Sequence, residues 1–167
     1  MSGPAENLRN VVRVAAWGEG AITGTVVCAA VIAYAGSGPL ESTWRLCLAI
    51  AGTVLVYWVA HLHAATLGDA LTRRNHPLQA LRHALVATTA IPASAALPIG
   101  VLVVLDRAGV ALEDAVWVAL FFTIAMLVLY SYLAGVRGGL GTRGRITSAL
   151  VGAGIGLLAA GLKIALH

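Results

Sequence analysis

Three ionisable side chains, Glu19, His61 and His63, stand within long apolar stretches of this sequence. Ionisable groups at membrane depth are costly, which makes them candidates for function. Along a helix, Glu19 is about 9 Å from Arg13, and the two histidines are about 9–12 Å from Asp69. These distances predict that all three side chains lie near one level of the membrane. A carboxylate and an imidazole at that level stabilise each other by pairing.

The two histidines point about 200° apart around a helix, so only one of them can face Glu19. We expect this contact to involve His61. The candidate polar site then consists of Arg13, Trp17, Glu19, Thr23, Trp58, His61 and His63. Three uses of these side chains are open: a structural clasp between two helices, a pathway for monovalent cations or protons, or a transition-metal site built on His-x-His and one carboxylate.

Catalysis has little support in the sequence. No nucleophile stands at a recognisable spacing from a general base and a residue that would orient that base. The thiolate or further carboxylate ligands that fix a metal geometry are also missing. We therefore expect no enzyme activity, no catalytic residues, no cofactor and no bound metal.

The composition indicates whether the chain is dissolved in water or in lipid. Of the 167 residues, 59% are hydrophobic and 11% are charged, and the mean hydropathy is +0.88. Such a chain needs lipid rather than water as its solvent. Stretches of roughly twenty apolar residues can cross a hydrocarbon core, and they occur at about 14–35, 44–68, 84–105, 112–135 and 146–166. We predict an all-α, polytopic integral membrane protein with five transmembrane helices in a single domain, residues 1–167.

The basic residues between these stretches alternate from one side to the other. One side carries Arg9, Arg13, Arg73, Arg74, Arg82, Arg137, Arg143 and Arg145, and the other carries Arg45, Arg107 and Lys163. Basic residues concentrate in cytoplasmic loops, which predicts a cytoplasmic N-terminus and an outer C-terminus. Topology and anionic headgroups thus account for the net charge of +4, and we expect no nucleic-acid partner. Ten arginines against one lysine suggest a bacterial protein, multi-pass in the cell membrane.

Small residues recur at every fourth position in two stretches, as Gly20-xxx-Gly24-xxx-Cys28 and as Gly152-xxx-Gly156-xxx-Ala160. Such stripes let helix backbones approach closely, either within one chain or between the copies of a homo-oligomer. The two cysteines, Cys28 and Cys47, differ in depth by about 10 Å, whereas a disulfide needs Cα atoms within about 7 Å. We expect both thiols to be free and packed.

The first stretch opens with Arg13-Val-Ala-Ala-Trp17-Gly18-Glu19-Gly20, which resembles the Arg-x-x-x-Phe-Ser-Asp-Gly opening of the lysosomal and bacterial potassium-channel family. Trp58-Val-Ala-His61 is similar to that family's Trp-x-x-His, and Ala90-Ile91-Pro92 resembles its Leu-Pro step. The resemblance rests on these short motifs and covers about the first hundred residues. It implies a pore-lining first helix that Glu19, Arg13 and His61 hold in place.

A second resemblance is to the vacuolar iron transporter family, whose members have five spans. Leu8-Arg9 and Glu19-Gly20 are similar to its Leu-Arg start and Asp-Gly step, and the glycine-rich fourth loop and fifth stretch look like its ending. That family gathers metal with Glu and Met residues between the second and third spans, where this chain has Arg73-Arg74-Asn75-His76. Because a basic loop repels divalent cations, divalent-metal transport is an alternative only.

We expect an integral membrane protein that conducts monovalent cations or protons, with the lipid bilayer and further copies of itself as partners. The alternative is a non-conducting structural or accessory membrane protein. A polar face that continues through the membrane favours a pathway, and an apolar outer half favours the clasp. The first stretch beyond Thr25 reads Val-Val-Cys-Ala-Ala-Val-Ile-Ala, which favours the clasp, but a hydrophobic constriction can gate a pore.

The charge asymmetry predicts that the 69–83 and 136–145 connections are cytoplasmic. Single cysteines introduced there, in a chain whose Cys28 and Cys47 are replaced, should react with a membrane-impermeant thiol reagent only after the cells are opened. Labelling beside Arg74 by reagent added to intact cells would contradict this topology.

Overall fold

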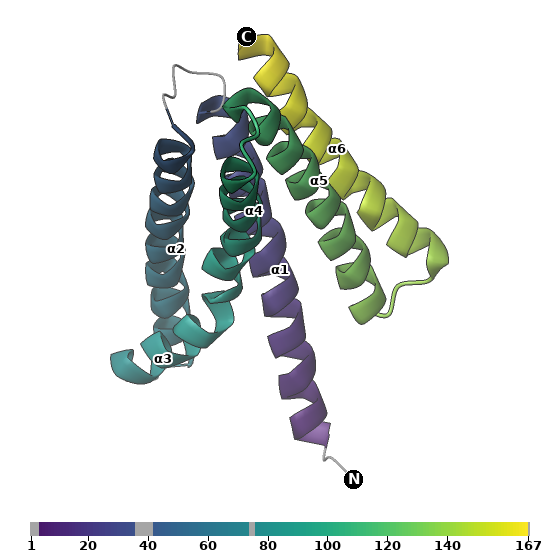
Figure 1. The fold of residues 1–167 in the computed structure, drawn as a ribbon. Coiled ribbons are helices and arrows are strands. Elements are labelled where there is room, and N and C mark those ends of the chain that lie inside the picture. The colour runs from purple at the N-terminus through teal and green to yellow at the C-terminus, as the bar shows by residue number, and fades with distance from the viewer. Residues whose placement is uncertain (1–3, 36–41, 74–75, 167) are drawn as a thin grey trace.

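The computed structural model describes residues 4–35, 42–73 and 76–166, and the side chains of residues 4–17, 73, 77 and 166 lie outside this description. The described residues form six α-helices (Figure 1), which are α1 Pro4–Ala35, α2 Thr43–Arg73, α3 Pro77–Thr88, α4 Ala90–Arg107, α5 Leu112–Arg137 and α6 Thr142–Leu166. No strand occurs in this part of the chain. The prediction of an all-α fold is confirmed.

Segments of these helices are long and apolar enough to cross a membrane. In the described residues there are five, at Gly18–Ala35, Thr43–Thr72, Leu78–Arg107, Leu112–Arg137 and Thr142–Ala165. The predicted number of spans is therefore confirmed. Figure 1 shows the two chain ends at opposite ends of the bundle, with the α5–α6 turn at the end nearer the N-terminus. We call these ends the N-terminal end and the C-terminal end.

Helix α1 lies at the centre of the bundle. It contacts each of the other five helices, and Figure 1 shows α2 and α3 on one side of it and α5 and α6 on the other. Of its spanning window, 44% is buried, against 22% for the windows of α2 and α6. Lipid supplies no hydrophobic drive between helices, so this central position depends on close packing.

Gly20 and Gly24 bring α1 against α4. A Cβ added at Gly24 would lie 2.5 Å from the carbonyl oxygen of Ile91 and would also meet the hydroxyl of Ser94. A Cβ added at Gly20 would lie 3.1 Å from the nearest α4 side-chain atom. Cys28, the next member of this stripe, is fully buried. The first small-residue stripe therefore packs within one chain.

The second stripe packs α6 against α5. A Cβ added at Gly152 would lie 2.5 Å from the hydroxyl oxygen of Ser131, and one at Gly156 would lie 2.7 Å from Cγ2 of Ile124. Neither helix could approach the other so closely with a larger residue at these positions. Packing within the chain, the first of the two uses expected for these stripes, is confirmed for both.

Between α3 and α4 the structure differs from the single helix expected over 84–105. Pro92 has no backbone N–H, so the carbonyl of Thr88, four residues earlier, lacks its helical donor, and the proline ring also crowds that carbonyl. The helix is interrupted at Thr89. The third span is therefore two helices that together cover Leu78–Arg107.

The interior of the bundle is apolar. Its core cluster includes Cys28 and Ile32 of α1, Ile50 of α2 and Leu120 of α5. Cys28 and Cys47 are both buried and free, which confirms the prediction for the two thiols. The core is therefore held by side-chain packing, without a disulfide between these two cysteines.

Gly24→Ala is expected to destabilise the bundle, because its methyl group would occupy the space of the Ile91 carbonyl. Overpacking of this kind costs about 1–3 kcal/mol. Gly154→Ala is the matched control, since no atom lies within 4 Å of a Cβ added there, and alanine should favour the helix by up to about 1 kcal/mol. Thermal unfolding in detergent measures both variants. Equal Tm values would contradict the close approach of α1 and α4.

Candidate functional site

Two members of the candidate polar site can be placed on α1. Glu19 is exposed, and Thr23 is half-buried. The Thr23 hydroxyl donates to the backbone carbonyl of Glu19 at 2.9 Å, so this bond stays within the helix and does not involve the carboxylate. The side chains of Arg13 and Trp17 lie outside the described residues.

The two histidines of the candidate polar site lie on different faces of α2. His61 stacks on Tyr57 of its own helix, with ring centroids 6.0 Å apart and ring planes at 18°. His63 is exposed. No hydrogen bond or ion pair joins Glu19 to either histidine, and the structure describes all three side chains. Among the described residues, no three His, Cys, Asp or Glu side chains gather as metal ligands would.

Trp58 forms a polar contact between α2 and α3. Its indole Nε1–H donates to the hydroxyl oxygen of Thr88 at 3.1 Å, and that hydroxyl donates to the carbonyl of Ala84 at 2.8 Å. Thr88 is buried and is the last residue of α3. The bond therefore ties the interruption between α3 and α4 to α2. It also connects Trp58-Val-Ala-His61 with the segment just before Ala90-Ile91-Pro92, two motifs of the potassium-channel resemblance.

A second contact between α2 and α3, absent from the sequence-based site, pairs Asp69 with His83. Asp69 Oδ2 lies 3.5 Å from His83 Nδ1, and the carboxylate is 16% exposed against 60% for the imidazole. The two groups carry opposite charges when the imidazole is protonated. Asp69 lies seven residues before residue 76, which precedes α3, and His83 lies seven residues after it. Because α2 and α3 run in opposite directions from this point, residues at equal distances from it lie at the same level. This symmetry is the sequence signal that could have identified the pair.

The C-terminal end of the bundle holds a buried lysine. Lys163 of α6 is fully buried, and its Nζ lies 5.1 Å from the centroid of the Trp117 ring on α5. The face of an indole ring attracts a cation electrostatically. At the same end, the hydroxyl of Thr43 on α2 donates to Asp106 Oδ1 on α4 at 2.6 Å. From the sequence, Lys163 could be interpreted only as a topological charge, because the depth of a residue in a span does not say which helix its side chain faces.

One face of α1 is left uncovered by the other helices. Glu19, Ala30 and Tyr34 are exposed, and Thr23 and Val26 between them are half-buried. At 3.6 residues per turn these five positions share one face of the helix. We call this line of side chains the α1 stripe. It runs from a carboxylate near the N-terminal end to a phenol near the C-terminal end and is apolar in the middle.

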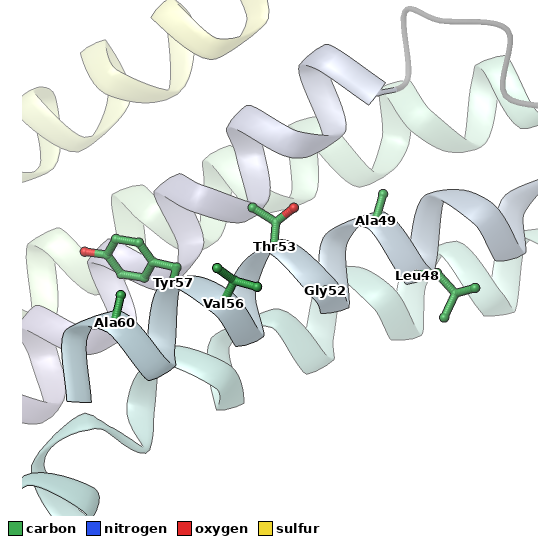
Figure 2. A pocket seen from close by; sticks show the side chains of 7 residues that line it. All are labelled: Leu48, Ala49, Gly52, Thr53, Val56, Tyr57 and Ala60. Atoms are coloured by element: carbon green, nitrogen blue, oxygen red, sulfur yellow. The ribbon is translucent and has the colours of Figure 1, made fainter. Parts of the chain in front are cut away.

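A groove of about 660 Å³ follows α2, and Figure 2 shows that its lining side chains all come from this helix. Small residues form much of it, among them Ala49, Gly52 and Ala60, and Thr53 and Tyr57 supply its hydroxyl groups. A site for a polar small molecule needs several polar groups that converge on one point. An open groove on a single helix does not provide them, so we do not place the functional site here.

A double-mutant cycle tests the bond between Trp58 and Thr88. Trp58→Phe removes the indole donor, and Thr88→Val removes the hydroxyl, so the double variant should lose less stability than the sum of the single losses. The expected coupling is about 0.5–1.5 kcal/mol, measured by thermal unfolding in detergent. Trp44→Phe, at a tryptophan that is 67% exposed, is the control and should be additive with Thr88→Val. Additivity for Trp58→Phe as well would show that the bond does not form.

Compared with known proteins, the chain matches no family model, no curated protein and no solved structure. Residues 4–35, 42–73 and 76–166 are almost entirely helical, and they contain five apolar segments of a length that suits an integral membrane protein.

Proposed function

We propose that this protein is a multi-pass protein of the cell membrane that conducts monovalent cations or protons along the α1 stripe, with further copies of the chain covering that stripe. The α1 stripe supports this proposal. The most buried of the described spans leaves one face open, and that face begins with an ionisable residue, Glu19. The resemblance to the potassium-channel family supports the same use of the first helix.

The chemistry of the α1 stripe suits cation entry at its N-terminal end. The exposed carboxylate of Glu19 raises the local concentration of cations. The hydroxyl hydrogen of Thr23 is engaged with a backbone carbonyl, so its oxygen presents lone pairs to a passing cation. Val26 and Ala30 then form an apolar segment, which can gate a pore by excluding water.

The interior of one chain is a poor route for a cation. Among the described residues of α1, Thr25 is the one buried polar side chain, and its hydroxyl donates to the carbonyl of Ala21 at 2.7 Å. A single hydroxyl does not make a polar path through the membrane. At the C-terminal end, the fully buried side chain of Lys163 packs beside the Trp117 ring and occupies the interior of the bundle. These features favour a route between copies of the chain over a route through the middle of one bundle, and this is why the proposal includes a homo-oligomer.

The polar contacts between helices favour a second candidate function, that of a non-conducting accessory protein. Three polar contacts join helices to one another: Trp58 with Thr88, Asp69 with His83, and Thr43 with Asp106. Interhelical hydrogen bonds stabilise membrane bundles whether or not anything passes through them. In this second candidate the α1 stripe faces lipid or the helix of another protein.

Flux measurements on Ala30 variants separate the two candidates. Ala30→Phe should lower potassium or proton flux into proteoliposomes severalfold, because a large side chain narrows the apolar segment of the α1 stripe. Ala30→Ser should raise the flux, because a hydroxyl makes that segment easier to wet. Ala51→Phe is the matched control, since Ala51 is an exposed alanine on α2, away from the α1 stripe. Its flux should equal that of the unmodified protein.

Potassium and proton flux equal to that of protein-free vesicles, at pH 5–8 and at both polarities of voltage, would contradict conduction. The accessory function would then be the better account. Flux that falls equally in Ala30→Phe and Ala51→Phe would instead contradict the assignment of the route to the α1 stripe.

A further inference from the structure

The turn end of the α5–α6 hairpin carries positive charge without an acidic residue near it in the sequence, because the acidic residues of the hairpin, Glu113 and Asp114, lie in the first turn of α5 at its other end. From Ala115 to His167 the sequence contains no Asp or Glu, yet it contains Arg137, Arg143 and Arg145 around the turn and Lys163 near its end. Arg137 and Arg143 are both exposed. Neither guanidinium forms an ion pair or a hydrogen bond with any residue that the structure describes.

The turn between α5 and α6 holds these two arginines at one end of the bundle. The Leu140 N–H donates to the carbonyl of Gly135 at 3.0 Å, and Gly139 has a positive φ of 72°, so the end of α5 is closed tightly. A Cβ added at Gly135 would lie 3.2 Å from Cα of Arg145, which shows how closely the two helices meet here. Arg137 follows Gly135 by two residues, and Arg143 precedes Arg145 by two residues. Both arginines are therefore closer to the turn than this contact, one on each side of it.

Neither the stability of α6 nor a partner in the bundle explains Arg143. It lies in the first turn of its helix, where the helix dipole disfavours a cation by about 0.3–1 kcal/mol. Arg145, in the same turn, is held differently, because its Nε–H donates to the carbonyl of Leu140 at 2.7 Å. Arg143 has no such bond, and its guanidinium is left to an outside anion.

The level of the turn in the membrane indicates which anion is available. The apolar span of α5 ends at Arg137, and that of α6 begins at Thr142. We therefore expect the turn to lie at the boundary between hydrocarbon and headgroups. Phosphate oxygens are the main anionic acceptors at that depth. A guanidinium donates two parallel hydrogen bonds to a phosphate, whereas an ammonium acts as a point charge.

We propose that Arg137 and Arg143 form a binding site for the phosphate group of an anionic membrane lipid. The hairpin supplies charge and paired N–H donors from two helices, and the lipid supplies the counter-charge that this part of the chain lacks. The site does not depend on the proposed conduction. The proposal gives these two arginines a ligand. The orientation of the chain in the membrane, by contrast, requires only a basic residue of either type.

Lysine variants distinguish a phosphate site from a purely topological charge. Arg137→Lys with Arg143→Lys keeps both positive charges, and with them the topology, but loses the paired donors. The full-length protein in neutral detergent is titrated with phosphatidylglycerol, with phosphatidylcholine of the same acyl chains, or with inorganic phosphate, and Tm is measured. Phosphatidylglycerol should raise the Tm of the unmodified protein by about 3–6 °C at tenfold excess over Kd.

In the double lysine variant, the rise in Tm caused by phosphatidylglycerol should be half as large or smaller. In Arg107→Lys, the rise in Tm should be as large as in the unmodified protein. Arg107 is the matched control, because it is exposed in the last turn of α4 at the C-terminal end and has Asp106 beside it. An equal rise with phosphatidylcholine, or with inorganic phosphate, would overturn the assignment to an anionic lipid. A full rise in the double lysine variant would show that charge alone is sufficient and would overturn the site.

Discussion

The close approach of α1 to α4 is the constraint on which the rest of the bundle depends. Lipid tails are as apolar as the side chains, so helices associate in a membrane through van der Waals packing and interhelical hydrogen bonds. Gly24 admits the Ile91 carbonyl to a point where a Cβ would be only 2.5 Å away. With α1 held at that distance, its other sides meet α2, α5 and α6. The α1 stripe is the face that remains uncovered.

The interruption between α3 and α4 belongs to the same arrangement. Pro92 deprives the Thr88 carbonyl of its helical donor, and an unsatisfied backbone group is costly where no water is present. The Trp58 indole fixes the end of α3 by its bond to the Thr88 hydroxyl. Directly after the interruption, Ile91 meets Gly24 of α1. A proline, a tryptophan and a glycine from three helices therefore determine where the third span bends.

The spans and the close helix packing could be predicted from the sequence. The length of an apolar stretch determines whether it can span a membrane, and small residues at every fourth position allow two helices to approach closely. The sequence was not sufficient for contacts that depend on how each helix is rotated. Depth alone suggested a contact between Glu19 and His61, whereas Glu19 is exposed and His61 stacks on Tyr57. The burial of Lys163 could not be predicted either, since it requires knowing which side of α6 faces α5.

In the function that we propose, the α1 stripe faces a water-filled route rather than lipid. Thiol accessibility can distinguish these two surroundings, in a reconstituted chain whose Cys28 and Cys47 are replaced. Ala30→Cys should react with a small, charged methanethiosulfonate reagent much faster than Ala51→Cys, which is exposed on α2 and should face lipid. Reaction at Ala30→Cys no faster than at Ala51→Cys would mean that the α1 stripe is covered by lipid, and the proposed route would then be wrong.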